Sequence, residues 1–353
     1  MKKMIGALLI ASMLGATLLT ACGGSGGQGT TAAAAAPEAA QSKAPESGPA
    51  ETVQSEAAKA EELNYPEKPI TLLITFEAGG TTDVATRLFV KYWQKNLPEN
   101  VNVINIDGAG GNVGIAEAKK QKGDGYYLVV QSAPFAMNAA LGTANFTWED
   151  FEPISLYFES YMALCVRSDS EYQTFDDFKK AVEEDPSNVK YGVYAGSPMM
   201  STLLALQDYT QAQFNVVDIP KTKATELLAG RVDAYCDAFA QMKSYIDSGD
   251  FRCLGVFAPE RLAEYPDIPT MKEMGVDYII TEQKYGMWAP KGTPDEILDY
   301  LNESIKKTYE DPEFAEELSK MCFVPVYTTR AEYTDWLTSI YTKFSEFVQT
   351  LQQ

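Results

Sequence analysis

The feature that most constrains the fold is the stretch ITLLITFEAGGTTDVATR, which covers residues 70–87. Its first half is almost wholly apolar, as in a strand that is buried on both faces of a parallel sheet. Gly79 and Gly80 then allow the backbone to turn sharply and allow another group to approach it closely. The stretch predicts a strand, a tight loop and a helix whose first N–H groups are open to an anion.

The start of this helix carries signals of its own. Thr81 or Thr82 is expected to be the N-cap residue, and Asp83 would then lie in the first turn, where a negative charge suits the helix dipole. We interpret Asp83 as a structural residue of the helix start rather than as a ligand contact.

The same order of elements recurs along the chain. A strand at 101–106 is followed by the loop DGAGGN at 107–112 and a helix at 113–120. Continued alternation predicts an α/β fold with mostly parallel sheets and flanking helices. The apolar stretch at 153–166 and a strand within 278–290 are expected to connect two lobes, with a cleft between them. Ligands bind at the carboxyl ends of such strands, where this chain has Gly, Ser, Thr and Asn.

Composition removes several classes of function. The 353 residues suffice for two domains with hydrophobic cores, and a net charge of −20 makes nucleic acid an unsuitable partner. The chain has no histidine, which excludes histidine bases, histidine-containing triads and histidine metal sites. We therefore expect no metal, no other cofactor and no enzyme. Cys165 and the pair Asp233 and Asp237 are the candidates for catalysis, and both fit core or ligand-contact roles better.

The first residues have the features of a bacterial targeting segment. A basic start and an apolar run at 5–19 precede LTAC, which ends at Cys22 and resembles a lipobox, in which the cysteine is lipidated. The alternative is an ordinary signal peptide with an incidental cysteine. The apolar run is short for a transmembrane helix. Residues 23–63 are rich in Gly, Ala, Ser, Pro and Glu, and they are predicted to form a flexible tether to the membrane.

Four more cysteines follow, at positions 165, 236, 253 and 322. Outside the cytoplasm they could pair, but their spacing fits neither a disulfide framework nor a metal motif. Buried free thiols are the expectation. Cys236 and Cys253 are the one pair that merits a test.

The glycine-rich loop at 107–114 resembles a dinucleotide-binding fingerprint only in part. Its last glycine comes one position late, and no convincing acidic residue for a ribose ends the next strand. What remains is a second helix N-terminus with exposed amides. The two termini, at 79–82 and 110–112, would converge on one anionic group; the alternative is that both loops are merely tight turns.

A series of motifs resembles the Bug-type family, the extracytoplasmic solute receptors of tripartite tricarboxylate transporters. The resemblance extends from about position 65 to the C-terminus, and the order and spacing of the motifs are specific although each motif is weak. It implies a type II periplasmic-binding-protein fold whose two lobes close on a small carboxylate. The motifs are YPEKPI at 65–70, GGTTD at 79–83 with Arg87, GAGGN at 108–112, DGY at 124–126, Asn138, YG at 191–192, LAGRVD at 228–233, Asp237 and APKGTP at 289–294.

The resemblance also implies the ligand contacts. Backbone amides and hydroxyls of the first two loops would hold a carboxylate, often with ordered waters, and the third loop would line the same cleft. Serines and a threonine of the other lobe would face the far end of the ligand, and an aspartate would orient waters or an amino group. The predicted contacts are Gly79, Gly80, Thr81, Thr82, Gly111, Asn112, Ser132, Asn138, Ser197, Ser201, Thr202 and Asp237.

The chain departs from the family pattern at three places. Glu77 and Ala78 replace two prolines, and a carboxylate there would repel an anion unless it points away or meets a ligand ammonium group. PKTKA at 220–224 replaces a Tyr-x-Gly-Gly motif; we expect Lys221 and Lys223 on the surface, with pairing to a second ligand carboxylate as the alternative. KY at 284–285 stands where the family tends to have aromatic residues.

These observations predict a lipid-anchored, monomeric, extracytoplasmic binding protein that hands a small carboxylate to membrane permease subunits. The predicted parts are a signal peptide at 1–22, a tether at 23–63, lobe I at 64–164 and 286–353, and lobe II at 165–285. A ligand-sensing subunit of a membrane signalling receptor is the alternative, and an extracellular enzyme fits less well.

Overall fold

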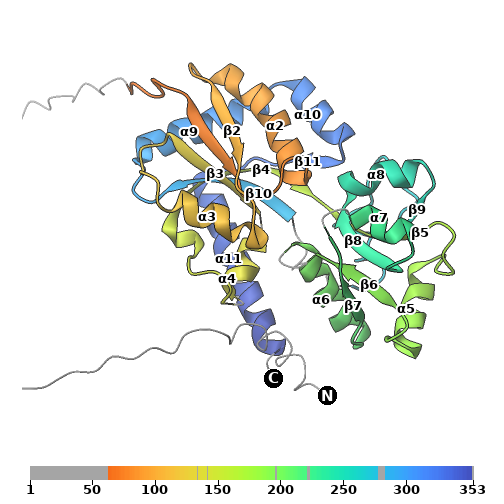
Figure 1. The fold of residues 1–353 in the computed structure, drawn as a ribbon. Coiled ribbons are helices and arrows are strands. Elements are labelled where there is room, and N and C mark those ends of the chain that lie inside the picture. The colour runs from red at the N-terminus through yellow and green to blue at the C-terminus, as the bar shows by residue number, and fades with distance from the viewer. Residues whose placement is uncertain are drawn as a thin grey trace, which may run out of the picture. The chain divides into compact units, whose positions relative to one another are not determined.

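Two β-sheets organise the part of the chain that the computed structural model describes (Figure 1). The described residues are 63–132, 134–140, 142–194, 197–220, 223–276 and 283–351. The predicted signal peptide with Cys22, nearly all of the predicted tether, and Lys221 lie outside them. Within the described residues, no helix is both long enough and apolar enough to cross a membrane.

Lobe I contains the six-stranded sheet, in the order β11-β4-β10-β3-β1-β2. Its strands are β1 (Ile70–Ile74), β2 (Val101–Asn105), β3 (Tyr127–Ser132), β4 (Phe151–Ser160), β10 (Gln283–Pro290) and β11 (Phe323–Pro325). The helices that belong to it are α2 (Thr81–Trp93), α3 (Asn112–Ala118), α4 (Pro134–Ala140), α9 (Asp295–Thr308), α10 (Pro312–Lys320) and α11 (Arg330–Leu351). Short 3₁₀ turns are η2 (Gln94–Asn96), η3 (Ala109–Gly111) and η4 (Trp148–Asp150).

Lobe II contains the five-stranded sheet, in the order β7-β6-β8-β5-β9. Its strands are β5 (Met162–Arg167), β6 (Lys190–Val193), β7 (Asn215–Asp218), β8 (Ala234–Ala238) and β9 (Phe251–Phe257). Its helices are α5 (Phe175–Glu184), α6 (Met199–Thr210), α7 (Lys223–Leu228) and α8 (Phe239–Asp247).

Both sheets are mixed, so the prediction of mostly parallel sheets is wrong in this detail. β1 is parallel to β2 and β3, and β6 is parallel to β7 and β8. The strands that pass between the lobes run against their neighbours: β10 is antiparallel to β3 and β4, and β5 is antiparallel to β8 and β9. Parallel pairing needs a crossover connection, usually a helix, that brings the chain back to the end of the sheet where the previous strand began. A strand that arrives from the other lobe has no such connection, and here it pairs antiparallel.

The chain passes directly from one sheet to the other at Tyr161, the single residue between β4 and β5. The return passage ends at β10, and residues 283–285 already pair with β3 and β4. Lobe I is therefore assembled from two separate parts of the sequence.

The apolar run of β1 is explained by burial on both faces, as predicted. Leu72 and Ile74 are fully buried in one core cluster, which also contains Trp93 of α2 and Leu298 of α9. Leu73 points to the opposite face and is fully buried in a second cluster. A strand with helices on both sides needs apolar residues at consecutive positions.

A local capping signal marks the start of α5. Thr174 is the N-cap residue, its side chain accepts a hydrogen bond from the Asp177 N–H, and Asp177 completes a capping box. Two helices were not predicted. α8 begins directly after β8 with Ala238 as its N-cap residue, so no turn residue marks the change from strand to helix. α4 occupies a segment that we expected to be a loop.

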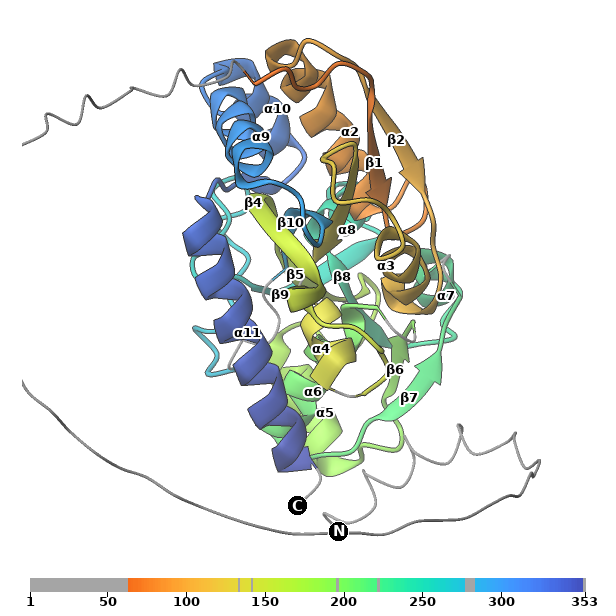
Figure 2. The ribbon, with the colours of Figure 1, turned by 90° about the vertical axis from the view of Figure 1, so that its left-hand side faces the viewer.

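The last helix, α11, packs its apolar face against lobe I and also reaches lobe II. Ile340 and Phe344 of α11 form a buried cluster with Ala136 of α4 and with Leu204 of α6. Figure 2 shows α11 running alongside β4 and α4 toward α6. Lys284, whose role the sequence left open, lies over the Trp336 ring of α11 with its Nζ 5.8 Å from the ring centre.

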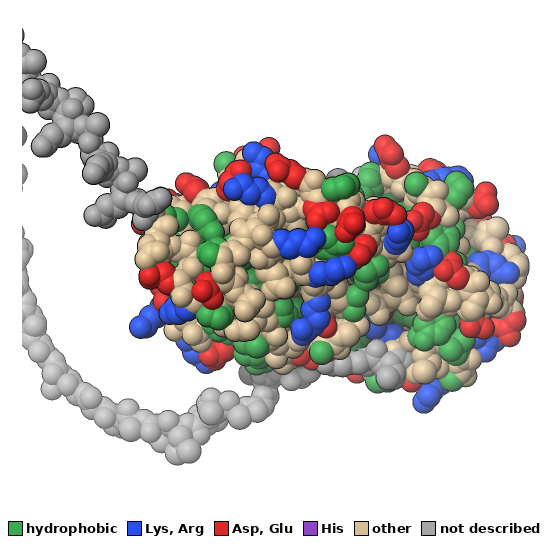
Figure 3. Space-filling model, turned by 90° about the horizontal axis from the view of Figure 1, so that it is seen from above, with side chains coloured by type: hydrophobic (Ala, Val, Ile, Leu, Met, Phe, Trp, Pro, Cys, Tyr) green, Lys and Arg blue, Asp and Glu red, His purple; other side chains and the backbone are tan. Residues whose placement is uncertain are grey.

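Acidic and basic side chains are interspersed on the face seen in Figure 3. Two surface ion pairs are formed at α10: Lys91 of α2 with Glu317 of α10 at 2.9 Å, and Lys95 of η2 with Asp311, the N-cap residue of α10, at 3.0 Å. Exposed pairs of this kind contribute little to stability.

Candidate functional site

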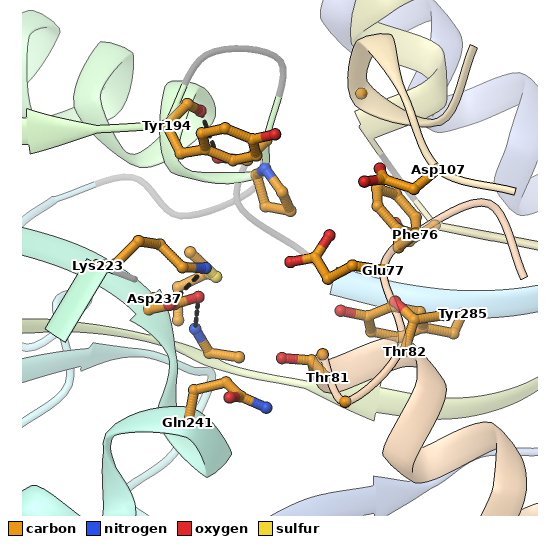
Figure 4. Close-up of a pocket in the computed structure, with 18 of the residues that line it drawn as sticks. Phe76, Glu77, Thr81, Thr82, Asp107, Tyr194, Lys223, Asp237, Gln241 and Tyr285 are labelled. Atoms are coloured by element: carbon orange, nitrogen blue, oxygen red, sulfur yellow. Dashed lines mark hydrogen bonds and ion pairs between the residues drawn. The ribbon is translucent and has the colours of Figure 1, made fainter. Parts of the chain in front are cut away.

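A cavity of about 300 Å³ lies between the two lobes, at the ends of several strands (Figure 4). Lobe I supplies the residues after β1 and β2 and the end of β3, whereas lobe II supplies the residues after β6 and at the end of β8. The lining residues are Phe76, Glu77, Ala78, Gly79, Gly80, Thr81, Thr82, Asp107, Gly110, Ser132 and Tyr285 from lobe I, and Met162, Tyr194, Ser197, Pro198, Lys223, Asp237, Ala238 and Gln241 from lobe II.

The N-terminus of α2 opens onto this cavity. Gly80, not Thr81 or Thr82, is the N-cap residue, and it makes no side-chain cap. The helix therefore begins one residue earlier than the capping rule for threonine predicts. Thr81 and Thr82 are its first two residues, and N–H groups at these positions have no acceptor inside a helix. They face a cavity that a carboxylate can enter.

The two glycines before α2 have different roles. Gly79 has a φ of +80°, a conformation that other L-residues rarely adopt. Gly80 has a φ of −75°, which any residue tolerates. An added Cβ on Gly80 would lie 3.3 Å from the Glu77 carbonyl oxygen, so space rather than conformation restricts this position.

Asp83 holds the loop in place, as its interpretation as a structural residue implies. Its carboxylate accepts hydrogen bonds from the Gly79 N–H at 2.9 Å, from Arg87 Nε at 2.8 Å and from Asn105 Nδ2 at 3.0 Å. The Gly79 amide is thus engaged by the protein itself. Burial would raise the pKa of Asp83, but the bonds from Arg87, Gly79 and Asn105 outweigh it and hold that pKa below its usual value.

Asp83→Ala should destabilise the protein by about 2 kcal/mol at pH 7, the scale of lost hydrogen bonds to a charged group. Because the folded-state pKa is lowered, this stability is present above the unfolded pKa, about 4, and is lost as pH falls through the lower folded pKa. Chemical denaturation between pH 7 and pH 3 gives the free energy of unfolding of both proteins. The difference between them should be constant down to about pH 5 and should shrink below about pH 4. Asp169→Ala, at an exposed pair, is the control; a gap as wide at pH 3 as at pH 7 would contradict the argument.

The second glycine-rich loop does not present its amides as predicted. The Gly111 N–H donates to the Gly108 carbonyl at 3.1 Å, and the Asn112 N–H donates to the Ala109 carbonyl. Gly111 and Asn112 do not line the cavity, whereas Gly110 does. The turn η3 consumes these donors, so the two helix termini do not form one cradle.

The Asn112 and Asn138 side chains are also used within lobe I. Asn112 Nδ2 donates to the Thr143 carbonyl at 3.2 Å, and Asn138 Nδ2 donates to the Gly110 carbonyl at 3.3 Å. Asn138, like Asn112, does not line the cavity. These asparagines fix the shape of the second loop, which is a structural role.

Two predicted hydroxyl contacts of lobe II also turn away from the cavity. Ser201 Oγ donates to the Pro198 carbonyl at 2.7 Å, and Thr202 Oγ1 donates to the Met199 carbonyl at 2.8 Å. Both residues are buried in α6 and do not line the cavity. Ser197, at the start of the same segment, does line it.

Lys223 and Asp237 form a largely buried ion pair at the lobe II wall. Lys223 Nζ lies 2.7 Å from Asp237 Oδ2, and the exposed fractions of the two side chains are 19% and 11%. The expectation of a surface position is therefore wrong for Lys223. No local pattern predicts this contact, because the partners lie on α7 and β8, fourteen positions apart.

Ser132 offers a polar group that the protein leaves unused. It is 5% exposed, it lines the cavity, and its Oγ has no hydrogen-bond partner among the described residues. A buried hydroxyl without a partner is costly, and a ligand oxygen would satisfy it. Ser132 is one of the contacts that the family resemblance implies.

Several residues that line the cavity were not among the predicted contacts, and the position of two of them after a strand could have indicated them. Asp107 lies two residues after the end of β2, and Tyr194 lies one residue after the end of β6. Ligands usually bind at the carboxyl ends of strands in such sheets, so both positions are expected contacts. Gln241 could not be found, because α8 itself was not predicted.

Tyr285 is another residue that lines the cavity. Burial raises the pKa of its hydroxyl, which forms a hydrogen bond with Thr82.

Neither thiols nor metal ligands form a site in the described residues. The described cysteines are free, and Cys165 of β5 lies opposite Cys253 of β9. Cys236 lies on β8, across β5, so the suggested pair of Cys236 with Cys253 is not formed. Burial raises the pKa of the Cys236 thiol to about 12. No described group of carboxylates and thiols is arranged to hold a metal ion.

The sequence is similar to a known family of transport receptors. The model of the tripartite tricarboxylate transporter family receptor matches residues 86–352. The chain belongs to this receptor family. An Agrobacterium vitis relative, described as the UPF0065 protein in the TAR-I ttuE-ttuC' intergenic region, is 32% identical over 269 residues, which are 74% of this chain and 78% of the relative.

Solved structures agree with the fold of this receptor family. MatC from Rhodopseudomonas palustris with bound malate has a TM-score of 0.73 at 22% identity, covering 80% of this chain and all of the other. A second R. palustris protein, with adipate, has a TM-score of 0.74 at 22% identity, covering 82% and 98%. The two-lobed type II fold is thus confirmed. Receptors of this family bind solutes outside the cytoplasm and are not enzymes.

Proposed function

We propose that the protein is a lipid-anchored receptor that captures a small carboxylate and delivers it to the membrane subunits of a tripartite tricarboxylate-type transporter. The family match supports the class of ligand, and malate and adipate occupy two proteins of the same fold. The lipobox-like LTAC and the low-complexity stretch after it support attachment of the mature chain to the membrane by Cys22.

The observation that carries the proposal is the open N-terminus of α2. The N–H groups of Thr81 and Thr82, the positive end of the helix dipole and the unpartnered Ser132 hydroxyl face one cavity. Lys223, the basic side chain among the described lining residues, is engaged by Asp237. Backbone amides rather than a cationic side chain would therefore hold the carboxylate.

Thr81→Pro tests the role of an amide directly. Thr81 is the first helical residue, where proline is well tolerated, and Gly80 already has the extended conformation that precedes a proline. The change removes one N–H and should weaken carboxylate binding about 10- to 100-fold, the equivalent of a lost charge-assisted hydrogen bond. The melting temperature of the ligand-free protein should stay within a few degrees. Calorimetry with a panel of mono-, di- and tricarboxylates gives the measurement.

Thr81→Val is the matched control, because it keeps the N–H and removes only the hydroxyl. It should bind within a few-fold of wild type. Equal affinities of the proline variant and the wild-type protein would mean that the α2 terminus does not hold the ligand. Binding of no carboxylate by the wild-type protein would refute the proposed function as a whole.

A further inference from the structure

Four cysteines lie in the described part of the chain, and two of them face each other across neighbouring strands. Cys165 of β5 is directly opposite Cys253 of β9 in an antiparallel pair, so both side chains project from the same face of the lobe II sheet. Directly opposed residues in such a pair have Cα atoms about 4.5–5.5 Å apart, and a disulfide bond needs about 4.4–6.8 Å. The two thiols can therefore be joined while the strands stay paired.

The backbone pairing of these two strands is interrupted next to the cysteines. The register shifts between Leu164 and Cys165, so β9 has one residue, Leu254, more than β5 at this point. β9 is also the last strand of its sheet, and a single bridge from Val256 to Thr270 extends the pairing beyond it. A covalent bond between β5 and β9 would secure the sheet where its hydrogen-bond ladder is weakest.

The positions of the other two described cysteines do not suit a bond to Cys165. Cys236 of β8 is opposite Leu164, and successive residues of a strand point to opposite faces, so Cys236 lies on the other face of the sheet. Cys322 belongs to lobe I, between α10 and β11, and its Sγ lies 3.7 Å from Glu264 Oε2. Cys253 is the one described cysteine that shares a face with Cys165 on a neighbouring strand.

The two thiols differ in their access to solvent. Cys165 is fully buried in the lobe II core, whereas Cys253 is partly exposed. Burial and the neighbouring Cys253 thiol raise the pKa of Cys165 well above its usual value, so Cys165 is a poor target for a reagent from solution. Cys253 is the thiol that an oxidant reaches first, and Cys165 is the thiol that completes the bond.

We infer that Cys165 and Cys253 form a disulfide bond when the protein meets a disulfide donor outside the cytoplasm, where receptors of this family act and where disulfide bonds form and persist. The Cys253 thiolate attacks one sulfur of the donor, which gives a mixed disulfide and releases the first donor thiol. The Cys165 thiolate then attacks Cys253 Sγ and releases the second donor thiol. Two cysteine thiols are oxidised, one donor disulfide is reduced, and the two cysteine protons end on the two donor thiols.

The bond would stabilise lobe II because it closes a long loop. The segment between the two cysteines contains β6, β7 and β8 and the helices α5 to α8. Closing a loop of this length restricts the unfolded chain strongly. The oxidised protein should therefore melt about 5 °C or more above the reduced protein. This inference does not depend on the ligand, and its test needs none.

Peptide mapping tests the bond directly. The purified full-length protein is incubated with oxidised glutathione or with dithiothreitol, and it is also refolded from urea in the same two buffers, so that slow access to Cys165 does not hide the bond. Free thiols are then blocked with N-ethylmaleimide. Trypsin places the four cysteines on separate peptides, at 123–167, 232–243, 253–261 and 321–330. Mass spectrometry should find 123–167 joined to 253–261, two hydrogens lighter than their sum, and the other two peptides blocked.

Cys253→Ser should abolish both the joined peptide and the difference in melting temperature between the two buffers, and its partly exposed position makes loss of folding unlikely to interfere. Cys322→Ser is the matched control, because it removes another partly exposed thiol and should leave the bond and the shift unchanged. Four blocked thiols after refolding in oxidised glutathione, or a bond from Cys253 to Cys236, would overturn the inference. A bond that leaves the melting temperature unchanged would overturn its stabilising role.

Discussion

Lys223→Met is expected to lower the free energy of unfolding by about 3–5 kcal/mol, the cost of removing one partner of a buried ion pair. The Asp237 side chain is 11% exposed and lies at the end of β8, with strand β5 and strand β6 on either side. Without the ammonium group 2.7 Å away, its charge would remain in a low-dielectric wall. Chemical denaturation of the ligand-free protein gives the measurement.

A double-mutant cycle separates this charge effect from lost packing. Asp237→Asn keeps an oxygen that can accept the Ala238 N–H, as Asp237 Oδ1 does now at 2.9 Å. The variant that combines it with Lys223→Met should be more stable than Lys223→Met alone. Lys180→Met removes a lysine from an exposed pair and should cost less than about 0.5 kcal/mol. Strictly additive effects of the two cavity substitutions would show that the pair is not coupled.

Gly286→Ala is expected to destabilise the protein by about 3 kcal/mol or more, at or above the usual range for overpacked cores. An added Cβ would lie 1.9 Å from the Tyr333 hydroxyl oxygen and 2.2 Å from its Cζ. Tyr333 is 1% exposed, and its hydroxyl accepts a hydrogen bond from Trp288 Nε1 at 2.6 Å. The ring can yield only if this bond breaks and α11 moves away from the sheet.

Gly192→Ala is the matched control for this prediction. Gly192 also lies within a buried strand, but its added Cβ would meet the flexible end of Ile219 at 2.9 Å. It should cost clearly less than Gly286→Ala in the same denaturation experiment. The double variant Gly286→Ala, Tyr333→Ala should lose less free energy of unfolding than the two single variants together, because the truncated side chain no longer clashes with the new Cβ. If the two glycine variants were equally stable, Tyr333 would not be the rigid neighbour described here.

Local patterns in the sequence explain some elements of the fold completely. The double-sided burial of β1 follows from consecutive apolar residues, and the start of α5 follows from the capping box of Thr174 and Asp177. α8 was not predictable in this way, because Ala238 ends a strand and caps a helix without a turn between them. Strand direction in the mixed sheets depends on which lobe the chain has come from, and this is not a local property.

Part of the cavity lining could be anticipated from the sequence. The family resemblance named Ser132 and Asp237 as contacts, and both line the cavity onto which the α2 terminus opens. Gly111 and Thr202 were misplaced because each donates a hydrogen bond to a backbone carbonyl a few residues earlier. Such internal bonds use the same donors that a ligand would use, and the residue type does not reveal which acceptor prevails.

The central position of β10 sets the order in which the two lobes can be completed. The five-stranded sheet of lobe II is formed by strands within residues 162–257, so all of them have been synthesised before β10 begins. In the other sheet, β10 is the strand that joins β3 to β4, and it begins only at Gln283. In a nascent chain that ends before this residue, β4 therefore cannot yet be joined to β1, β2 and β3, whereas all the strands of lobe II have been made.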